Sequence, residues 1–197
     1  MSDVVVGAGV GIGAVHLGYY LSELIFKEKT FEKGYVKPEF EYDYSVPHYV
    51  AEIMFGRRFI VGKSSDFASD VLPYRGSSVG VGTEIPLMAG AGVSAVVRAN
   101  TLSYKDGNVA MMYDGFFGLY QNFYFAKVLE LQLKGMLGYG GHHKGNGLAA
   151  STGLGLSLIT GNNFRLKAFA DYNLNRYSAH KPWLNSFMVG YSTSFFW

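Results

Sequence analysis

The sequence contains no cysteine, which excludes a disulfide framework, a thiolate metal site and a cysteine nucleophile. Charge is scarce as well: 16% of the 197 residues are charged and the formal net charge is +2, too small to indicate a nucleic-acid partner. With 5 prolines and 26 glycines, long helices are disfavoured. The segment nearest to a membrane-spanning helix, Val4 to Leu21, is interrupted by glycines, so no such helix is predicted.

What the chain does contain is a regular alternation of apolar and polar residues, the two-residue period of a β-strand. In 184–197 one face carries large side chains such as Phe187 and Trp197, and the other is mostly small or polar. The same alternation recurs in three earlier segments, 164–174, 148–158 and 129–139. Hairpin-sized breaks follow at 160–163, 140–146 and 105–108.

A soluble β-protein, such as a lipocalin-like barrel or a sandwich, also alternates, but three features favour a membrane barrel. The apolar faces continue for about 10–12 residues, the length that a tilted strand needs to cross a bilayer. The opposite faces are rich in glycine and serine, as expected around a narrow interior. Aromatic residues gather near the strand ends, where an interfacial girdle would place them. We therefore predict an all-β fold, a transmembrane antiparallel up-and-down β-barrel that forms a single domain over residues 1–197.

The C-terminal residues Tyr191-x-Thr193-x-Phe195-x-Trp197 place side chains of one face at alternate positions before a terminal aromatic residue. This pattern resembles the C-terminal assembly signal of bacterial outer-membrane β-barrel proteins, most of which end in phenylalanine. The resemblance implies insertion by the barrel-assembly machinery, with Tyr191, Phe195 and Trp197 as the signal, and residence in the outer membrane of a Gram-negative cell. It also implies export. Because no basic residue precedes Lys27, we expect the signal peptide to have been removed or to be absent from this sequence.

Bacterial single-chain barrels have an even number of strands, and we predict about ten, with eight as the alternative. The predicted strands are 184–197, 163–176, 147–159, 128–140, 108–124, 92–104, 77–88, 48–61, 34–45 and part of 3–25. The short turns then share the periplasmic side, and most of the longer connections lie outside. The count depends on 3–28, which is longer than one strand requires and could include a short helix or a plug.

The inward positions of these strands carry eight acidic and six basic residues. They are Lys37, Glu39, Glu41, Asp43, Glu52, Arg58, Glu84, Arg98, Asp114, Glu130, Lys134, Arg165, Lys167 and Asp171. A barrel of eight to ten strands leaves little free bore, and unpaired buried charge is costly. The leading interpretation is a structural interior held by salt bridges; a thin polar channel and a specific ion site are the alternatives. Glu39, Glu41 and Asp43 are the best candidates for a cation-attracting stripe.

Basic residues gather at the predicted outer strand ends. We hypothesise that outward residues such as Arg57 and Arg176 contact the phosphates of lipopolysaccharide, because arginine pairs well with phosphate. An ordinary hydrated loop surface is the alternative.

No pattern predicts a catalytic site, a metal or a cofactor. His142 and His143 lie in a glycine-rich loop and are better interpreted as turn residues. Ser178 and His180 are the one candidate pair, because lipid hydrolases of the lipid A deacylase type use a histidine and a serine two residues apart. Here their order is reversed, and no glutamate is evidently placed to orient the imidazole.

We therefore predict a non-enzymatic barrel that acts as a small channel or as a structural or assembly component of the outer membrane. A membrane-embedded lipid A hydrolase and a surface adhesin or partner-binding barrel are the alternatives. The expected partners are outer-membrane lipid, lipopolysaccharide and the assembly machinery. A larger envelope complex is a further candidate partner, and nucleic acid is not expected.

Overall fold

The computed structural model describes residues 46–61, 76–103, 107–126, 128–142, 145–161, 163–176 and 183–197. These ranges hold eight strands: β1 (Val50–Ile60), β2 (Gly76–Met88), β3 (Ala91–Ser103), β4 (Val109–Ala126), β5 (Leu129–His142), β6 (Gly145–Gly161), β7 (Phe164–Asn175) and β8 (Leu184–Phe196). The described part of the chain has no helix with the length and apolar character that crossing a bilayer would require.

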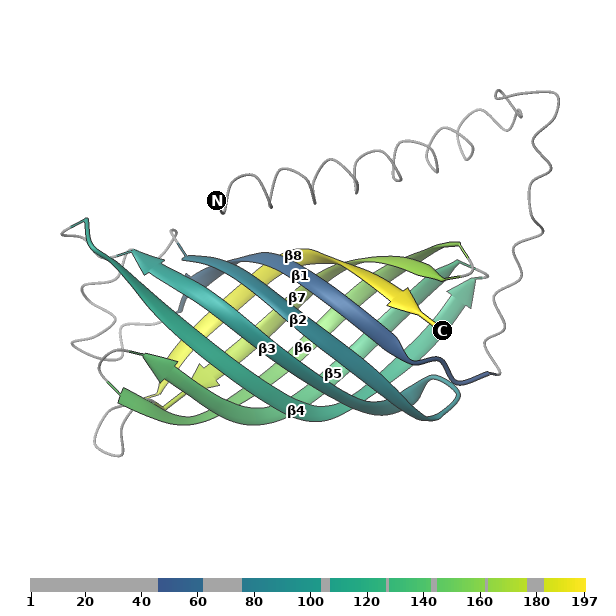
Figure 1. The fold of residues 1–197 in the computed structure, drawn as a ribbon, viewed down its shortest axis with the longest axis horizontal. Helices are drawn as coiled ribbons and strands as arrows, with labels where there is room; N and C mark the ends of the chain where they lie inside the picture. The colour runs from purple at the N-terminus through teal and green to yellow at the C-terminus, as the bar shows by residue number, and fades with distance from the viewer. Residues whose placement is uncertain are drawn as a thin grey trace, which may run out of the picture.

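The eight strands form one closed antiparallel barrel, in which each strand pairs with its neighbours in the sequence (Figure 1). The ring closes where β1 pairs with β8, from Val50 opposite Phe196 to Ile60 opposite Ser186. The predicted fold class, an antiparallel up-and-down barrel, is confirmed. The strand count is the alternative of eight and not the leading estimate of about ten, because the β1–β8 pairing leaves no edge at which another strand could join. The predicted strands 34–45 and 3–25 lie outside the described residues.

The barrel has two distinct ends. At one end the connections are short turns, 89–90, 127–128 and 162–163, and the same end holds the start of β1 and the end of β8. Gly90 in the first of these turns has a φ of 76°, a left-handed conformation that glycine adopts without steric cost. The ends of β1, β3, β5 and β7 and the starts of β2, β4, β6 and β8 lie at the opposite end. These two ends of the barrel are called the turn end and the loop end below.

The barrel is inverted relative to a soluble protein. Large apolar side chains point outward and are strongly exposed, such as Leu137 at 73%, Leu87 at 67% and Phe125 at 66%. Charged side chains point inward and are buried, such as Glu84 at 0% and Arg58 at 2%. Because successive residues of a strand face opposite sides of the sheet, the alternation in the sequence becomes an apolar outer wall and a polar interior.

Candidate functional site

The interior of the barrel is the candidate site, because it contains the buried charges of the described residues. All ten predicted lumen-lining residues in the described ranges lie inside: Glu52, Arg58, Glu84, Arg98, Asp114, Glu130, Lys134, Arg165, Lys167 and Asp171. The other four, Lys37, Glu39, Glu41 and Asp43, lie outside the described residues. The ten divide into two groups at different depths.

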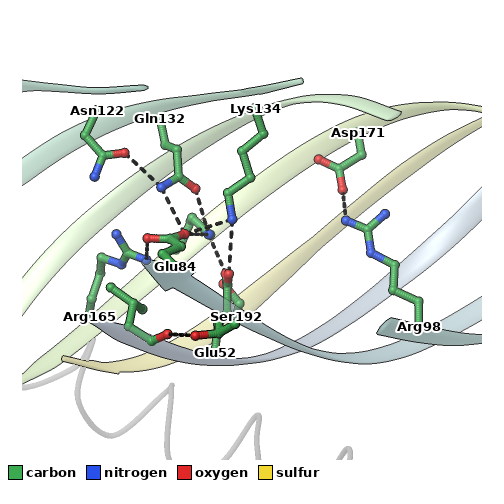
Figure 2. A network of polar contacts seen from close by, with 12 residues as sticks. Glu52, Glu84, Arg98, Asn122, Gln132, Lys134, Arg165, Asp171 and Ser192 are labelled. Atoms are coloured by element: carbon green, nitrogen blue, oxygen red, sulfur yellow. Dashed lines mark hydrogen bonds and ion pairs between the residues drawn. The ribbon is translucent and has the colours of Figure 1, made fainter. Parts of the chain in front are cut away.

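The first group lies toward the turn end and is called the turn-side cluster: Glu52, Glu84, Glu130, Lys134, Arg165 and Lys167. Figure 2 labels Glu52, Glu84, Lys134 and Arg165 of this cluster. Its members come from β1, β2, β5 and β7. Three carboxylates face three cations, so the cluster carries no net charge. Each member is there because its strand position faces inward, and the closed ring brings distant strands together across the bore.

Arg165 bridges two carboxylates of the turn-side cluster. Its Nη2 lies 3.0 Å from Glu84 and its Nη1 lies 2.8 Å from Glu130. Lys134 bridges two as well, with its Nζ 2.8 Å from Glu84 and 3.4 Å from Glu52. Lys167 forms a close ion pair with Glu52 and lies 3.7 Å from Glu84. Every cation of this cluster therefore contacts two carboxylates.

Neutral side chains complete the turn-side cluster. Gln132 Nε2 donates to Glu84 at 3.0 Å and to the Asn122 side-chain oxygen at 2.8 Å, and Asn122 donates to Glu130 at 3.1 Å. The hydroxyl of Ser192 donates to Glu52 (Figure 2). These bonds supply partners for buried carboxylate oxygens, which would otherwise destabilise the fold.

The second group lies toward the loop end and is called the loop-side cluster: Arg58, Arg98, Asp114 and Asp171. It consists of separate pairs. Arg58 Nη1 lies 2.7 Å from Asp114, and Arg98 forms a close ion pair with Asp171. Figure 2 shows the Arg98–Asp171 pair apart from the turn-side cluster. Two arginines and two aspartates again give no net charge.

Amides and a hydroxyl hold the Arg58–Asp114 pair in place. Arg58 donates through Nε to Ser186 at 2.8 Å and through Nη2 to Asn175 at 2.7 Å. Asn175 and Asn100 donate to Asp114 at 2.8 Å and 3.0 Å. The guanidinium of β1 and the carboxylate of β4 are thus held by groups from three further strands, β3, β7 and β8.

An apolar layer, called the septum below, lies between the two clusters. It consists of Met54, Val96, Phe116, Met136, Ala149, Phe169 and Met188, one residue from each strand except β2, and all are at most 8% exposed. The order along single strands sets its depth. On β1, Met54 lies between Glu52 and Arg58, and on β7, Phe169 lies between Lys167 and Asp171.

Glycines of the inner wall make room for the septum. A Cβ at Gly82 of β2 would lie 3.1 Å from Met54 Cε, and a Cβ at Gly56 would lie 3.4 Å from Met188 Cγ. The glycine-rich inner face noted in the sequence therefore accommodates large apolar side chains in the bore. Sequence reasoning missed these residues. The available signal was a single large apolar residue on an otherwise small or polar face, such as Met188 between Ser186 and Gly190.

Side chains fill the interior of the described barrel. A water-filled bore would expose the side chains that line it, yet nine of the ten inward charged residues are at most 4% exposed and the Lys134 side chain is 8% exposed. Toward the turn end, Val50, Ile159 and Phe196 form a further apolar group. A cavity there measures about 20 Å³, room for a single water molecule.

The residues predicted at the surface have the following positions. Arg57 is exposed on the outer wall near the loop end of β1, and Arg176 directly follows β7 and is half-buried. Tyr191, Phe195 and Trp197 face outward. Each lies against an aromatic ring on or beside a neighbouring strand: Tyr191 with Phe55 of β1, Phe195 with Phe164 of β7 and Trp197 with Tyr49, which precedes β1.

The candidates for chemistry lie largely outside the described residues. Ser178, His180 and His143 are not among them, and the side chain of His142 is not described either. Within the described ranges, no three histidine or carboxylate side chains are arranged to hold a metal ion.

Solved structures share this fold. No protein-family model matches the chain, and no curated protein matches it. The attachment invasion locus protein Ail of Yersinia pestis is 12% identical, with a TM-score of 0.52 over 77% of this chain and 99% of that one. Neisserial surface protein A is also 12% identical, with a TM-score of 0.55 over 76% and 96%.

The N-terminal β-barrel domain of Pseudomonas aeruginosa OprF is a third such structure, 16% identical, with a TM-score of 0.51 over 76% of this chain and 97% of that domain. The chain has the fold of small bacterial outer-membrane barrels. At these identities the likeness concerns the fold alone.

Proposed function

We propose that this chain is an integral outer-membrane β-barrel with a closed bore, which serves as a structural component of the membrane and does not conduct solutes. One observation supports the proposal. Two ion-pair clusters without net charge, and the septum between them, fill the interior of a barrel whose outer wall is apolar. An ion crosses a pore only if it keeps its hydration water or exchanges that water for polar protein groups. An apolar constriction offers neither. We further propose that the turn end faces the periplasm.

A lipid-facing outer wall can be tested at Leu154, which lies in the middle of β6 and is 53% exposed. The substitution Leu154→Arg places a charge in hydrocarbon and is expected to lower the free energy of unfolding in lipid vesicles by about 2–4 kcal/mol. Leu154→Met is the matched control and should have little effect. A wild-type protein that stays monodisperse in buffer without detergent would overturn the membrane proposal.

The closed bore can be tested by conductance in a planar bilayer. We expect the wild type to be silent, and we expect Met54→Ser/Met136→Ser/Met188→Ser, which makes the septum polar and smaller, to conduct. Phe116→Ala is a milder variant if the triple substitution does not fold. Steady conductance of the wild type would contradict the structural role and favour the alternative of a small channel.

We also propose that Tyr191, Phe195 and Trp197 direct assembly of the barrel in the cell. The proposal predicts that Phe195→Ala and Trp197→Ala lower the amount of barrel assembled in cells more than they slow refolding in detergent micelles. Phe187→Ala, an outward aromatic substitution at the other end of β8, is the control. Equal losses in both assays would mean that these residues act through stability alone.

A further inference from the structure

Arg57 is the only charged residue at an outward-facing strand position among the residues that the structure describes. It lies near the loop end of β1, opposite Val189 of β8 on one side and Ser77 of β2 on the other. It forms no ion pair with another described residue. The exposed guanidinium of Arg57 therefore has no counter-ion among the described residues, on an outer wall that is mostly apolar, and is available to an anion from the surroundings.

Two hydroxyl-bearing residues extend from Arg57 across the neighbouring strands. Ser77 of β2 is exposed, and its backbone N–H donates to Thr101 Oγ1 of β3 at 3.1 Å. The Thr101 hydroxyl in turn lies 3.5 Å from the Ser77 carbonyl oxygen, to which it donates. Arg57, Ser77 and Thr101 thus form one outward polar row over β1, β2 and β3, called the Arg57 row below.

Three other strands carry outward tyrosines near the loop end. Tyr113 of β4, Tyr139 of β5 and Tyr172 of β7 point outward with exposures of 56%, 56% and 37%. Aromatic residues at this depth favour the region between hydrocarbon and headgroups. The Arg57 row interrupts this girdle, so it lies at the depth where lipid headgroups begin.

A charge in hydrocarbon is costly, whereas a guanidinium next to a phosphate forms strong bidentate hydrogen bonds. We propose that the Arg57 row binds a phosphate of a membrane lipid in the leaflet around the loop end. That lipid is the phosphorylated glucosamine lipid of lipopolysaccharide, and this inference rests on the proposed function. Arg57 supplies the charge and two parallel N–H donors. Ser77 supplies a hydroxyl donor beside it, and Thr101 fixes the backbone of Ser77.

The full chain, refolded in detergent micelles, is titrated with lipid A, with dephosphorylated lipid A and with inorganic phosphate, and binding is measured by native mass spectrometry. Wild type is expected to bind lipid A, and Arg57→Leu to bind it about tenfold more weakly, the loss of a charge-assisted contact. Arg57→Lys should restore part of the affinity, because it keeps the charge but not the bidentate geometry.

Tyr139→Leu is the control on the far side of the loop end and should bind lipid A as the wild type does. Equal affinity of wild type and Arg57→Leu would overturn the proposal, as would equal binding of lipid A and its dephosphorylated form. Equally tight binding of inorganic phosphate would overturn the commitment to a lipid. The detergent requirement and conductance of the wild type are measured separately, so a failure of the closed-barrel proposal is distinguishable from a failure at Arg57.

Discussion

The turn-side and loop-side clusters both neutralise buried charges, but their ion pairs are arranged differently. In the turn-side cluster, Lys134, Arg165 and Lys167 each contact two carboxylates, and Glu84 contacts all three cations. In the loop-side cluster, Arg58 and Arg98 each have one carboxylate, and the remaining bonds go to amides and a hydroxyl. A branched network tolerates the loss of one member, whereas a separate pair does not.

The largest effect is expected when a separate pair is broken. Asp114→Asn keeps the shape of the side chain but leaves Arg58 buried without a carboxylate. We expect the free energy of unfolding to fall by about 3–5 kcal/mol, the cost of an uncompensated buried charge. Chemical unfolding in lipid vesicles measures this loss, and a loss below 1 kcal/mol would remove the distinction between the clusters.

A smaller effect is expected in the network. Glu84→Gln removes the most connected carboxylate, yet Lys134 and Lys167 keep Glu52, and Arg165 keeps Glu130. We expect a loss of about 1–2 kcal/mol, the scale of hydrogen bonds to a charged group. The same unfolding experiment applies. If Glu84→Gln destabilises the barrel more than Asp114→Asn does, network redundancy is the wrong explanation.

Removing both partners of the separate pair should cost less than removing one. In Arg58→Met/Asp114→Leu no buried charge lacks a counter-ion, but Ser186, Asn175 and Asn100 lose hydrogen-bond partners. We therefore expect a loss of unfolding free energy that is smaller than that of Asp114→Asn by about 1–2 kcal/mol. Comparison of this double variant with each single variant isolates the free-energy cost of a buried charge without its counter-ion. A double variant as unstable as Asp114→Asn would mean that the lost contacts, and not the charge, dominate.

The smallest effect concerns the contact between the loop-side cluster and the septum. The Arg98 guanidinium lies 5.5 Å from the centre of the Phe116 ring. A double-mutant cycle with Phe116→Leu and Arg98→Met should give a coupling energy of about 0.5–1 kcal/mol, the usual size of a cation–π interaction. A coupling energy of zero would show that the septum and this cluster are independent.

The sequence carried enough information to locate the strands. Residues 184–197 were predicted as a strand that the structure places at Leu184–Phe196, and 77–88 as one that runs over Gly76–Met88. The reason is that a sheet with one apolar face needs strict alternation. The strand count does not follow from alternation, because alternation indicates which face a residue occupies but not where the ring closes.

The contacts between interior side chains could not be predicted from the sequence either, because alternation does not give the register of the strands. Arg58 and Asp114 were both assigned to the inner face, yet they belong to β1 and β4 and meet only across the bore. Their pairing depends on the register of the intervening strands, which sets depth. The septum also depends on register, because Met54 and Phe169 form a layer only when their strands align.

The closing seam between β1 and β8 also affects folding kinetics. Tyr49 and Trp197 exchange two backbone hydrogen bonds of 3.1 Å, and these residues stand at opposite ends of the described chain. Every other strand pair is a local hairpin, so the seam carries the greatest loop-closure entropy and is expected to form last. Once β1 and β8 have paired, unfolding requires this long seam to open. We therefore expect slow unfolding and a long lifetime of the folded barrel.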